Sequence, residues 1–477
     1  MRLKLRYVSL ALVALIFIST SIYGLVEIGL DKSEKGISTP SFTPSVSTLN
    51  SYFFTAWLNR DNDEIRGAII DAMTGKILKR LVIDKDVLNI RASVSGGKTY
   101  LITYEKRNSQ AGDSDVYAAI VGYDGSFIKL LKISTEQNIL EVYPYATWDS
   151  RTGKYLLVYY IDKKMILHGV FIYEDGSIEY LKWYIETETD VKSVSFRVIG
   201  GNGYFVIVYT YQSKNQLDLL YTVVNAKTGE RVYDGILSKD PEMNEVVENC
   251  FGGICFKEYY YIPFNGYSTL SSERILFLGR ITLGEEKGKV WSISKYGVHP
   301  HLVDVGEKFL LTWIDYIDDK EGNVYACLID PINGPGKIID IGGDEHSEYA
   351  EKNVFAAYSP PIKNQEEEFY VLSWSRGKED YDIYTRTISV IEHLGDLTSL
   401  SEIPKNNQYV EGIAVNTLHK TFLVIDLRDD EHVIFALFGV LGEDIPPPVP
   451  ELWLIPLLII SLIIIALYKY GDKHRTN

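Results

Sequence analysis

The chain has 477 residues, with 48 Lys and Arg against 64 Asp and Glu, so its formal net charge is −16 at pH 7. This acidic balance argues against binding to nucleic acid or to anionic lipid headgroups, because both attract basic surfaces. Only three cysteines occur in the sequence, which excludes a fold held together by a dense set of disulfides.

Residues 1–24 have the pattern of a secretory signal peptide or of an uncleaved signal anchor. Arg2, Lys4 and Arg6 give a basic start, and the apolar run YVSLALVALIFISTSIYG (7–24) follows. Both features belong to secretory signals. No cleavage position stands out, so the two alternatives stay open.

A Ser/Thr/Pro-rich stretch, residues 25–48, comes next. Such a composition is typical of a linker between a membrane segment and a folded domain. Its latter part, from residue 39, is expected to enter the first structural repeat.

A unit of about fifty residues recurs between residues 39 and 442, and a fixed period of this size marks a repeat architecture. Its clearest part is a strand with a large aromatic residue near the end. The copies are SYFFTAWLN (51–59), KTYLITYEK (98–106), GKYLLVYYID (153–162), NGYFVIVYTY (202–211), EKFLLTWIDY (307–316), EFYVLSWSRG (368–377) and KTFLVIDLRD (420–429). The distance between the fourth and fifth copies is two periods, so a divergent unit is expected near Tyr261.

Each copy continues with a polar loop, another strand, a tight turn and a fourth strand. In the first unit these are EIRGAIIDA (64–72), the turn at Thr74-Gly75 and KILKRLVI (76–83). The Val, Ile, Tyr and Phe content is typical of strands, and glycine supplies the positive φ that tight hairpins need.

Four antiparallel strands per repeat predict an all-β fold, a β-propeller, in which radial repetition leaves only short sheet edges. Eight blades are favoured and seven are the alternative. A two-sheet sandwich fits less well, because it needs no constant period. The last unit lacks a fourth strand, and Gly24–Leu30 or the stretch after it is expected to supply that strand.

The C-terminal end predicts one membrane-spanning helix. A Pro-rich stalk (443–451) leads into the apolar segment LWLIPLLIISLIIIALY (452–468), which has the length and the flanking aromatic residues of a short transmembrane helix. Basic residues in the tail 469–477, and before the first apolar run, place both tails in the cytoplasm by the positive-inside rule. The propeller is therefore expected outside the cell, anchored by a single pass.

Acidic residues gather in the loops that a four-stranded blade presents on one face. These loops join the second and third strands of a blade or lead to the next blade. The candidate ligand residues on this rim are Asp61, Asp63, Asp113, Asp115, Asp318, Asp319, Asp344, Glu345, His346, Asp429 and Asp430.

Carboxylates on loops suit a hard cation such as calcium, and Asp315, Asp318, Asp319 and Glu321 form the densest cluster. The spacing does not match an EF-hand loop, and solvated turn residues explain the cluster equally well. No other cofactor is indicated.

Cys250 and Cys255 flank Phe-Gly-Gly-Ile. If Gly252-Gly253 forms a two-residue hairpin turn, the two cysteines face each other and an extracellular disulfide becomes possible. The alternative is a pair of small buried apolar residues.

The repeats resemble those of propellers in secreted and surface proteins, and the signal segment, propeller and Pro-rich stalk together resemble membrane-anchored cell-surface proteins of archaea. This resemblance implies a fold and a location but carries no catalytic residues.

Two functions fit the sequence. The first is a binding or scaffold module in the cell envelope that contacts proteins or glycans, with cation assistance as an option. The alternative is an extracellular glycosidase or lyase acting on polysaccharide. The G-x-S-x-G and H-E-x-x-H motifs are absent, and isolated carboxylates from different blades leave no motif, so the sequence favours binding over catalysis.

Overall fold

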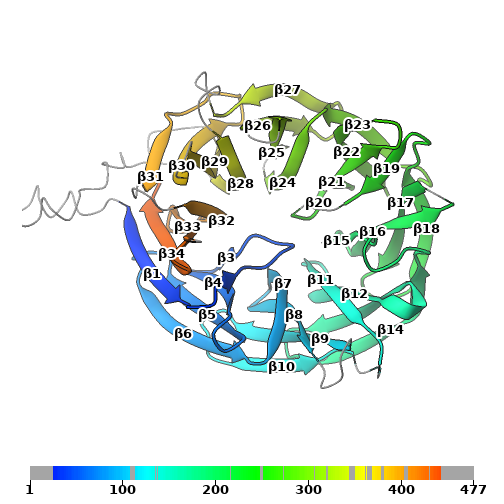
Figure 1. Ribbon diagram of the computed structural model, residues 1–477, viewed down its shortest axis with the longest axis horizontal. Helices are drawn as coiled ribbons and strands as arrows, with labels where there is room; N and C mark the ends of the chain where they lie inside the picture. Colours follow the sequence, from blue (N-terminus) through cyan, green and yellow to red (C-terminus); the bar gives the residue numbers. More distant parts are fainter. Residues whose placement is uncertain are drawn as a thin grey trace, which may run out of the picture.

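The computed structural model describes residues 25–441, apart from residues 108–112, 135, 137, 215, 248–250, 272, 306, 319–320, 343–349, 360, 362–367, 378–380, 402–406 and 429. Eight antiparallel sheets stand side by side in a closed ring (Figure 1). The chain is an eight-bladed β-propeller, which confirms the favoured blade count.

The first four blades follow the chain order from the innermost to the outermost strand. Blade 1 has a divided inner strand, β2 (Ile37–Ser38) and β3 (Val46–Leu49), followed by β4 (Tyr52–Asn59), β5 (Glu64–Asp71) and β6 (Ile77–Asp84). Blade 2 has β7 (Val87–Gly96), β8 (Thr99–Arg107), β9 (Ser114–Gly122) and β10 (Ile128–Lys132). Blade 3 has β11 (Glu141–Asp149), β12 (Lys154–Ile161), the short 3-10 helix η1 (Asp162–Lys164), β13 (Ile166–Tyr173) and β14 (Ile178–Glu186). Blade 4 has β15 (Phe196–Gly201), β16 (Tyr204–Ser213), β17 (Gln216–Asn225) and β18 (Arg231–Ser238).

The remaining blades repeat the pattern. Blade 5, the expected divergent unit, divides its inner strand into β19 (Met243–Val246) and β20 (Ile254–Phe256), followed by β21 (Tyr259–Ser268), β22 (Arg274–Thr282) and β23 (Lys289–Ser294). Blade 6 has β24 (Gly297–Val305), β25 (Lys308–Asp318), β26 (Glu321–Asp330) and β27 (Gly334–Asp340). Blade 7 has β28 (Ala350–Ser359), β29 (Phe369–Gly377), β30 (Tyr381–Ser389) and β31 (Thr398–Ser401). Blade 8 has β32 (Gln408–Asn416), β33 (Thr421–Arg428), β34 (Val433–Val440) and, as its outermost strand, β1 (Val26–Lys32).

The N-terminal strand β1 closes the ring. It pairs antiparallel with β34, with Val26 opposite Phe438 and Lys32 opposite Val433. The expected strand from the N-terminal side is therefore present. Residues 25–48, which the composition predicts as a linker, belong to the folded domain, because backbone pairing with β34 and β4 uses this polar stretch.

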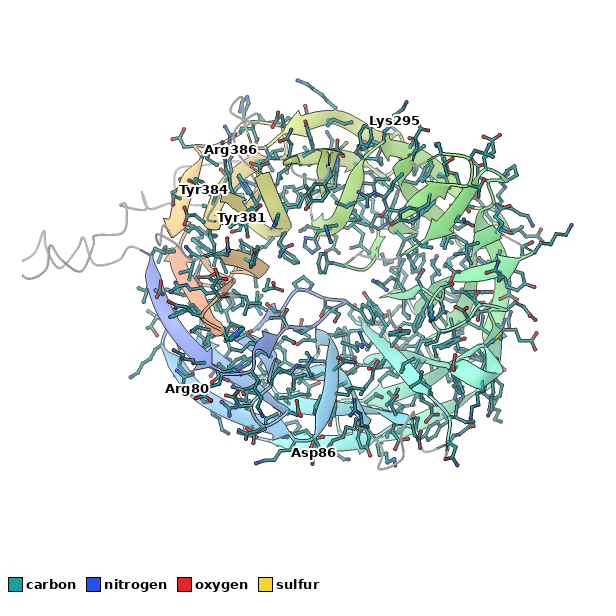
Figure 2. The ribbon with its side chains drawn as sticks, viewed as in Figure 1. Arg80, Asp86, Lys295, Tyr381, Tyr384 and Arg386 are labelled. Carbon is teal, nitrogen blue, oxygen red and sulfur yellow. The ribbon has the colours of Figure 1, made fainter. Side chains whose placement is uncertain are left out.

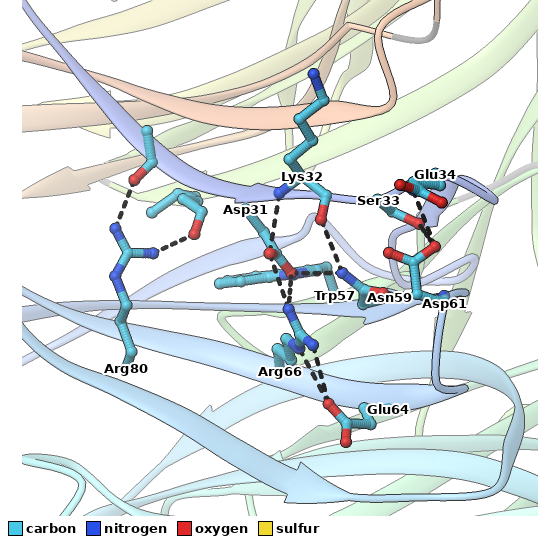
Figure 3. A network of polar contacts seen from close by, with 12 residues as sticks. Asp31, Lys32, Ser33, Glu34, Trp57, Asn59, Asp61, Glu64, Arg66 and Arg80 are labelled. Atoms are coloured by element: carbon cyan, nitrogen blue, oxygen red, sulfur yellow. Dashed lines mark hydrogen bonds and ion pairs between the residues drawn. The ribbon is translucent and has the colours of Figure 1, made fainter.

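Asp31 fixes the closing strand to blade 1 (Figure 3). Its carboxylate accepts hydrogen bonds from Trp57 Nε1 at 2.7 Å, Asn59 Nδ2 at 3.0 Å and Arg66 Nη1 at 2.9 Å. Arg80 adds hydrogen bonds to the main-chain oxygens of β1. The seam between the two ends of the domain is thus held by charge-assisted bonds as well as by the sheet.

Apolar side chains fill the space between neighbouring sheets (Figure 2). Among the described residues the buried apolar side chains form eight clusters, one at each blade junction. The aromatic residues that set the repeat period lie in these clusters and are at most 3% exposed: Trp57, Tyr104, Tyr159, Tyr209, Tyr261, Trp313 and Trp374. Six of these residues lie one to a junction, whereas Tyr261 shares the cluster between blades 5 and 6 with Trp313. The spacing of the six makes the period visible in the sequence.

The ring has two faces. We call the upper face the one that carries the loops between second and third strands and the connections from each outer strand to the next blade. Contacts between these segments confirm that they share one face, for example the bonds from Ser33 and Lys35 to Asp61. The strand β1 begins, and β34 ends, on the opposite, lower face, so both ends of the domain leave it there.

The signal segment 1–24, the stalk 443–451, the apolar segment 452–468 and the tail 469–477 lie outside the described residues. In the part of the chain that the structure covers, none of the helices has the length and apolar character that a membrane span requires.

Candidate binding site at the centre of the ring

Two loops enter the centre of the ring from opposite blades. Residues 39–45 separate β2 from β3 in blade 1. Across the ring, the described parts of the second loop are residue 247 and residues 251–253, between β19 and β20 in blade 5 (Figure 1). Each loop carries one phenylalanine toward the inner strands of its neighbours, Phe42 in the first and Phe251 in the second.

The first loop is tied to blades on both sides. The Phe42 N–H donates to the Arg91 carbonyl at 2.9 Å, and the Ser93 N–H donates to Thr43 Oγ1 at 2.8 Å. On the other side, Thr39 Oγ1 donates to Glu411 Oε2 at 2.7 Å. The loop therefore has a fixed position between blades 2 and 8.

The Phe42 ring lies among two arginines and two tyrosines. The guanidinium carbons of Arg197 and Arg91 lie 4.6 and 5.6 Å from its centroid, a geometry that gives cation–π attraction. The Tyr143 and Tyr145 rings lie 6.4 and 6.0 Å away, centroid to centroid.

Glu105, on β8, is the buried anchor of this arrangement. It accepts hydrogen bonds from Arg91 Nε at 2.8 Å, Arg91 Nη2 at 3.0 Å, Asn89 Nδ2 at 2.9 Å and the Tyr143 N–H at 2.8 Å. Tyr143 has a φ of +57° at a bulge in β11, a conformation that non-glycine residues rarely adopt. The carboxylate thus holds both the Arg91 side chain and the strained backbone beside it.

A cavity of about 240 Å³ opens beside Phe42 on the upper face. Three cationic side chains, Arg91, Lys192 and Arg197, line it together with Phe42 and Tyr143, and the described lining includes no acidic residue. Arg197 is buried, and Lys192 is exposed at the mouth. A positively charged pocket in a chain of charge −16 suits an anionic group.

The second loop packs differently. The Phe251 ring lies 4.6 Å from Phe355 and 6.2 Å from His301, centroid to centroid. His301 Nδ1 accepts a hydrogen bond from the Ala356 N–H at 3.2 Å. Burial lowers the pKa of His301 to about 4, so this half of the centre is neutral and apolar at physiological pH.

A larger cavity, about 820 Å³, lies on the outer wall between blades 4 and 5. Its walls are β18 and the loop before β23, joined by main-chain bonds such as Ile236 N–H to the Glu286 carbonyl at 2.9 Å. Its charged side chains have mixed signs (Asp234, Lys239, Asp240, Glu286 and Lys287). The central pocket, with charges of one sign and buried donors, is the better candidate site.

The structure places the sequence-predicted rim residues in separate loops around the ring. Asp61 holds the connection after β1, accepting from Ser33 Oγ at 2.9 Å and from the Glu34 N–H at 2.9 Å. Asp63 is exposed, 4.0 Å from Arg60. Asp430 accepts from Asn407 Nδ2 at 3.1 Å.

Two other rim candidates, Asp113 and Asp115, are 5% and 4% exposed. The sequence predicts them as loop residues, but the start of the next inner strand covers them. Asp319, Asp344, Glu345, His346 and Asp429 lie outside the described residues.

The predicted calcium cluster is described only in part. Asp315 accepts from Trp313 Nε1 at 2.9 Å and from Ser294 Oγ at 2.5 Å, so it joins two strands. Asp318 and Glu321 lie at the facing ends of β25 and β26, and Asp319 lies outside the description. No set of three or more His, Cys, Asp or Glu placed for a metal exists among the described side chains.

The cysteine pair is also described in part, because Cys250 is outside the described residues. Cys255 Sγ accepts a hydrogen bond from Asn202 Nδ2 at 3.2 Å, and the disulfide stays a prediction. The two-residue hairpin turn at Gly252-Gly253, which was the condition for the two cysteines to face each other, is not present in residues 251–253. β20 pairs with β21, and the Phe251 N–H donates to the Pro300 carbonyl in blade 6 at 3.4 Å, so tertiary contacts determine this segment.

Sequence reasoning missed the residues that line the central pocket. Arg91, Tyr143 and Arg197 are single residues on the inner strands of three different blades, and no motif connects them. The available signal was TPSFTPS (39–45), a Pro-containing insertion at a place where all the other units except blade 5 have an undivided inner strand.

The likeness of this chain to known proteins is confined to solved structures. No family model matches the chain, and no curated protein matches it. Among solved structures, the β-propeller domain of the Trilobed protease from Pyrococcus furiosus is 10% identical, with a TM-score of 0.44 over 76% of this chain and 98% of that one. A polysaccharide lyase of family PL25, an ulvan lyase, is 12% identical, with a TM-score of 0.46 over 77% and 98%. Trypanosoma rangeli sialidase is 8% identical, with a TM-score of 0.41 over 85% and 60%.

Proposed function

We propose that this protein is a membrane-anchored propeller of the cell envelope that binds acidic glycans in the pocket beside Phe42. The observation that supports this function best is the composition of that pocket, in which Arg91, Lys192 and Arg197 stand beside aromatic rings. The acidic surface elsewhere makes the pocket a local exception in charge.

The pocket chemistry matches a carboxylate or sulfate on a sugar. Guanidinium groups present planar sets of donors that fit such anions, and aromatic rings offer flat faces to a sugar ring. The volume of about 240 Å³ is below the range of drug-sized ligand sites, roughly 300–1,000 Å³. It suits one charged sugar residue of a polymer whose remainder lies across the upper face.

The position of the chain ends supports an outward-facing site. Val26 and Phe438 are paired on the lower face, and the expected membrane segments, residues 1–24 and 452–468, lie beyond them in sequence. If both segments lead to the membrane, the lower face points toward it. The pocket on the upper face then points outward, toward envelope polymers.

A polysaccharide lyase is the second candidate, and Tyr143 favours it. Tyr143 lines the pocket together with two arginines, and its hydroxyl donates to the Val191 carbonyl at 3.4 Å. Neutralising a uronate carboxylate makes removal of the neighbouring proton easier. Incubation with a polyuronate would then produce an unsaturated uronate that absorbs in the ultraviolet. Binding without this product supports the binding function alone.

The charge-reversing substitution Lys192→Glu is expected to weaken binding of an oligouronate by about tenfold or more, because one charge-assisted contact contributes roughly 1.5–3 kcal/mol. Lys192 is exposed, so the fold should be unaffected. Titration calorimetry on the full-length protein in detergent measures the effect, with a neutral oligosaccharide as the negative probe.

Lys35→Ala is the matched control, because Lys35 is an exposed lysine on the same face that does not line the pocket. Equal binding by the wild type and Lys192→Glu, or an equal loss in Lys35→Ala, would contradict the pocket assignment.

We also propose that rim carboxylates assist contacts with envelope proteins through calcium. Capture of partners from native membranes is expected to fall in the presence of a chelator and in the double variant Asp318→Asn, Asp319→Asn, with thermal stability unchanged. If partner capture is the same with the chelator and in the double variant, calcium does not assist these contacts.

A further inference from the structure

Two blade junctions on the upper face contain the same arrangement of buried acids. Asp115 on β9 and Glu141 on β11 both lie at the junction between blades 2 and 3. Asp218 on β17 and Glu245 on β19 repeat it between blades 4 and 5. The four residues are 4%, 1%, 2% and 1% exposed, respectively.

One oxygen of each aspartate is paired with a lysine. Asp115 Oδ2 lies 2.8 Å from Lys132 Nζ, and Asp218 Oδ2 lies 3.3 Å from Lys239 Nζ. Each glutamate has a serine neighbour as a hydrogen-bond donor, Ser134 for Glu141 and Ser238 for Glu245. The remaining oxygens have no hydrogen-bond partner among the described residues: Asp115 Oδ1, Glu141 Oε2, Asp218 Oδ1 and Glu245 Oε2.

The charges at each junction do not balance. The lysine side chains are 45% and 57% exposed, so water screens their attraction for the buried acids. At the first junction the other ionisable groups near Glu141 are Asp113, Glu136 with its partner Lys164, Tyr159, Tyr180 and His168. At the second, Asp240 adds a further negative charge. One buried negative charge is left uncompensated in each case, which is costly.

The junction between blades 6 and 7 shows how the same position is satisfied without a proton. Asn323 replaces the aspartate, and Glu351 replaces the glutamate. Glu351 accepts from the Val324 N–H at 2.5 Å and Trp374 Nε1 at 3.1 Å, and Arg376 Nε lies 3.9 Å away. At this junction the neutral amide of Asn323 takes the place of the aspartate, and the buried guanidinium of Arg376 takes the place of the exposed lysine.

We propose that Glu141 and Glu245 are each protonated in the folded protein. While the glutamate is neutral the junction stays closed, and when it loses its proton the glutamate and the neighbouring aspartate repel each other. Burial and the neighbouring aspartates raise the pKa of both glutamates to about 7. The folded state then binds protons that the unfolded chain releases above pH 4.5, the ordinary value. The resulting stabilisation is complete below that pH and is lost as the pH rises through about 7.

The test is thermal unfolding of the full-length protein in detergent between about pH 5 and about pH 8, on either side of the raised values. The wild-type Tm is expected to fall as the pH rises. Glu141→Gln and Glu245→Gln keep the shape of a neutral acid, so each should raise Tm at the alkaline end and flatten the pH dependence. The double variant should flatten it most.

Glu351→Gln is the matched control and should lower Tm at every pH with the wild-type slope, because both Glu351 oxygens already have donors and Arg376 lies beside them. Wild-type slopes in both single variants would overturn the proposal. Infrared spectra of the wild-type protein and of the double variant give a second measurement. A protonated carboxyl band that disappears between about pH 6 and about pH 8, and that is weaker in the double variant, supports the proposal. Burial also raises the pKa of Asp426 to about 7, so a band of equal strength in the double variant overturns it.

Discussion

Replacing Asp31 by alanine is expected to lower the free energy of unfolding by about 2–3 kcal/mol, because the substitution takes the acceptor from the buried donors of Trp57 and Asn59. Arg66 keeps its ion pair with Glu64. The Asp31 side chain is 12% exposed, and three groups of blade 1 donate to it, from Trp57, Asn59 and Arg66. Denaturant titration of the purified protein measures the loss.

Asp63→Ala provides the comparison, because the Asp63 side chain is 57% exposed and its nearest cation, on Arg60, is 4.0 Å away. A change within about 0.5 kcal/mol is expected there. A loss below about 1 kcal/mol in Asp31→Ala would show that sheet pairing alone closes the ring.

Glu105→Ala is expected to remove both stability and ligand binding. Arg91 loses its ion pair, and the Tyr143 N–H loses its acceptor at a backbone that is already strained. Breaking a buried pair of this kind costs about 3–5 kcal/mol. Unfolding and oligouronate binding are measured on the same sample.

Glu105→Gln separates the two contributions, because it keeps an acceptor oxygen but loses the charge. A smaller loss of stability than in the alanine variant is expected. If both variants bind the oligouronate as the wild type does, the positioned Arg91 is not part of the binding site.

The fold was predictable because the blade junctions are packed in a similar way, with buried apolar side chains at repeated positions. Trp57, Trp313 and Trp374 occupy equivalent buried positions, so their spacing gave the period, the blade count and the need for a strand from the N-terminal side. The divergent unit around Tyr261 could be located because the strand copies before and after it are two periods apart.

The site was not predictable for the opposite reason. Three inner strands, β7, β11 and β15, reach the pocket, and Arg91 and Arg197 look like ordinary polar residues until the ring brings them together around Phe42. The loop with Phe42 has the composition of a linker, and only its bonds to blades 2 and 8 distinguish it from one. The sequence predicts Asp115 as a rim ligand candidate, and its burial could not be predicted because the strand that covers it comes from the next blade.

The closing strand also determines when the domain can finish folding. β1 is synthesised first, yet its partner β34 is synthesised last, and the ion pair from Glu27 to Arg428 joins residues 401 positions apart. Until the last blade has been made, β1 has no partner strand, and unpaired strand edges attract other chains. Contacts this distant in sequence form late, since chain closure costs entropy before it gains energy. A chain that stops before residue 433 contains the first seven blades but lacks β34. The strand pair that joins the two ends of the domain therefore cannot form.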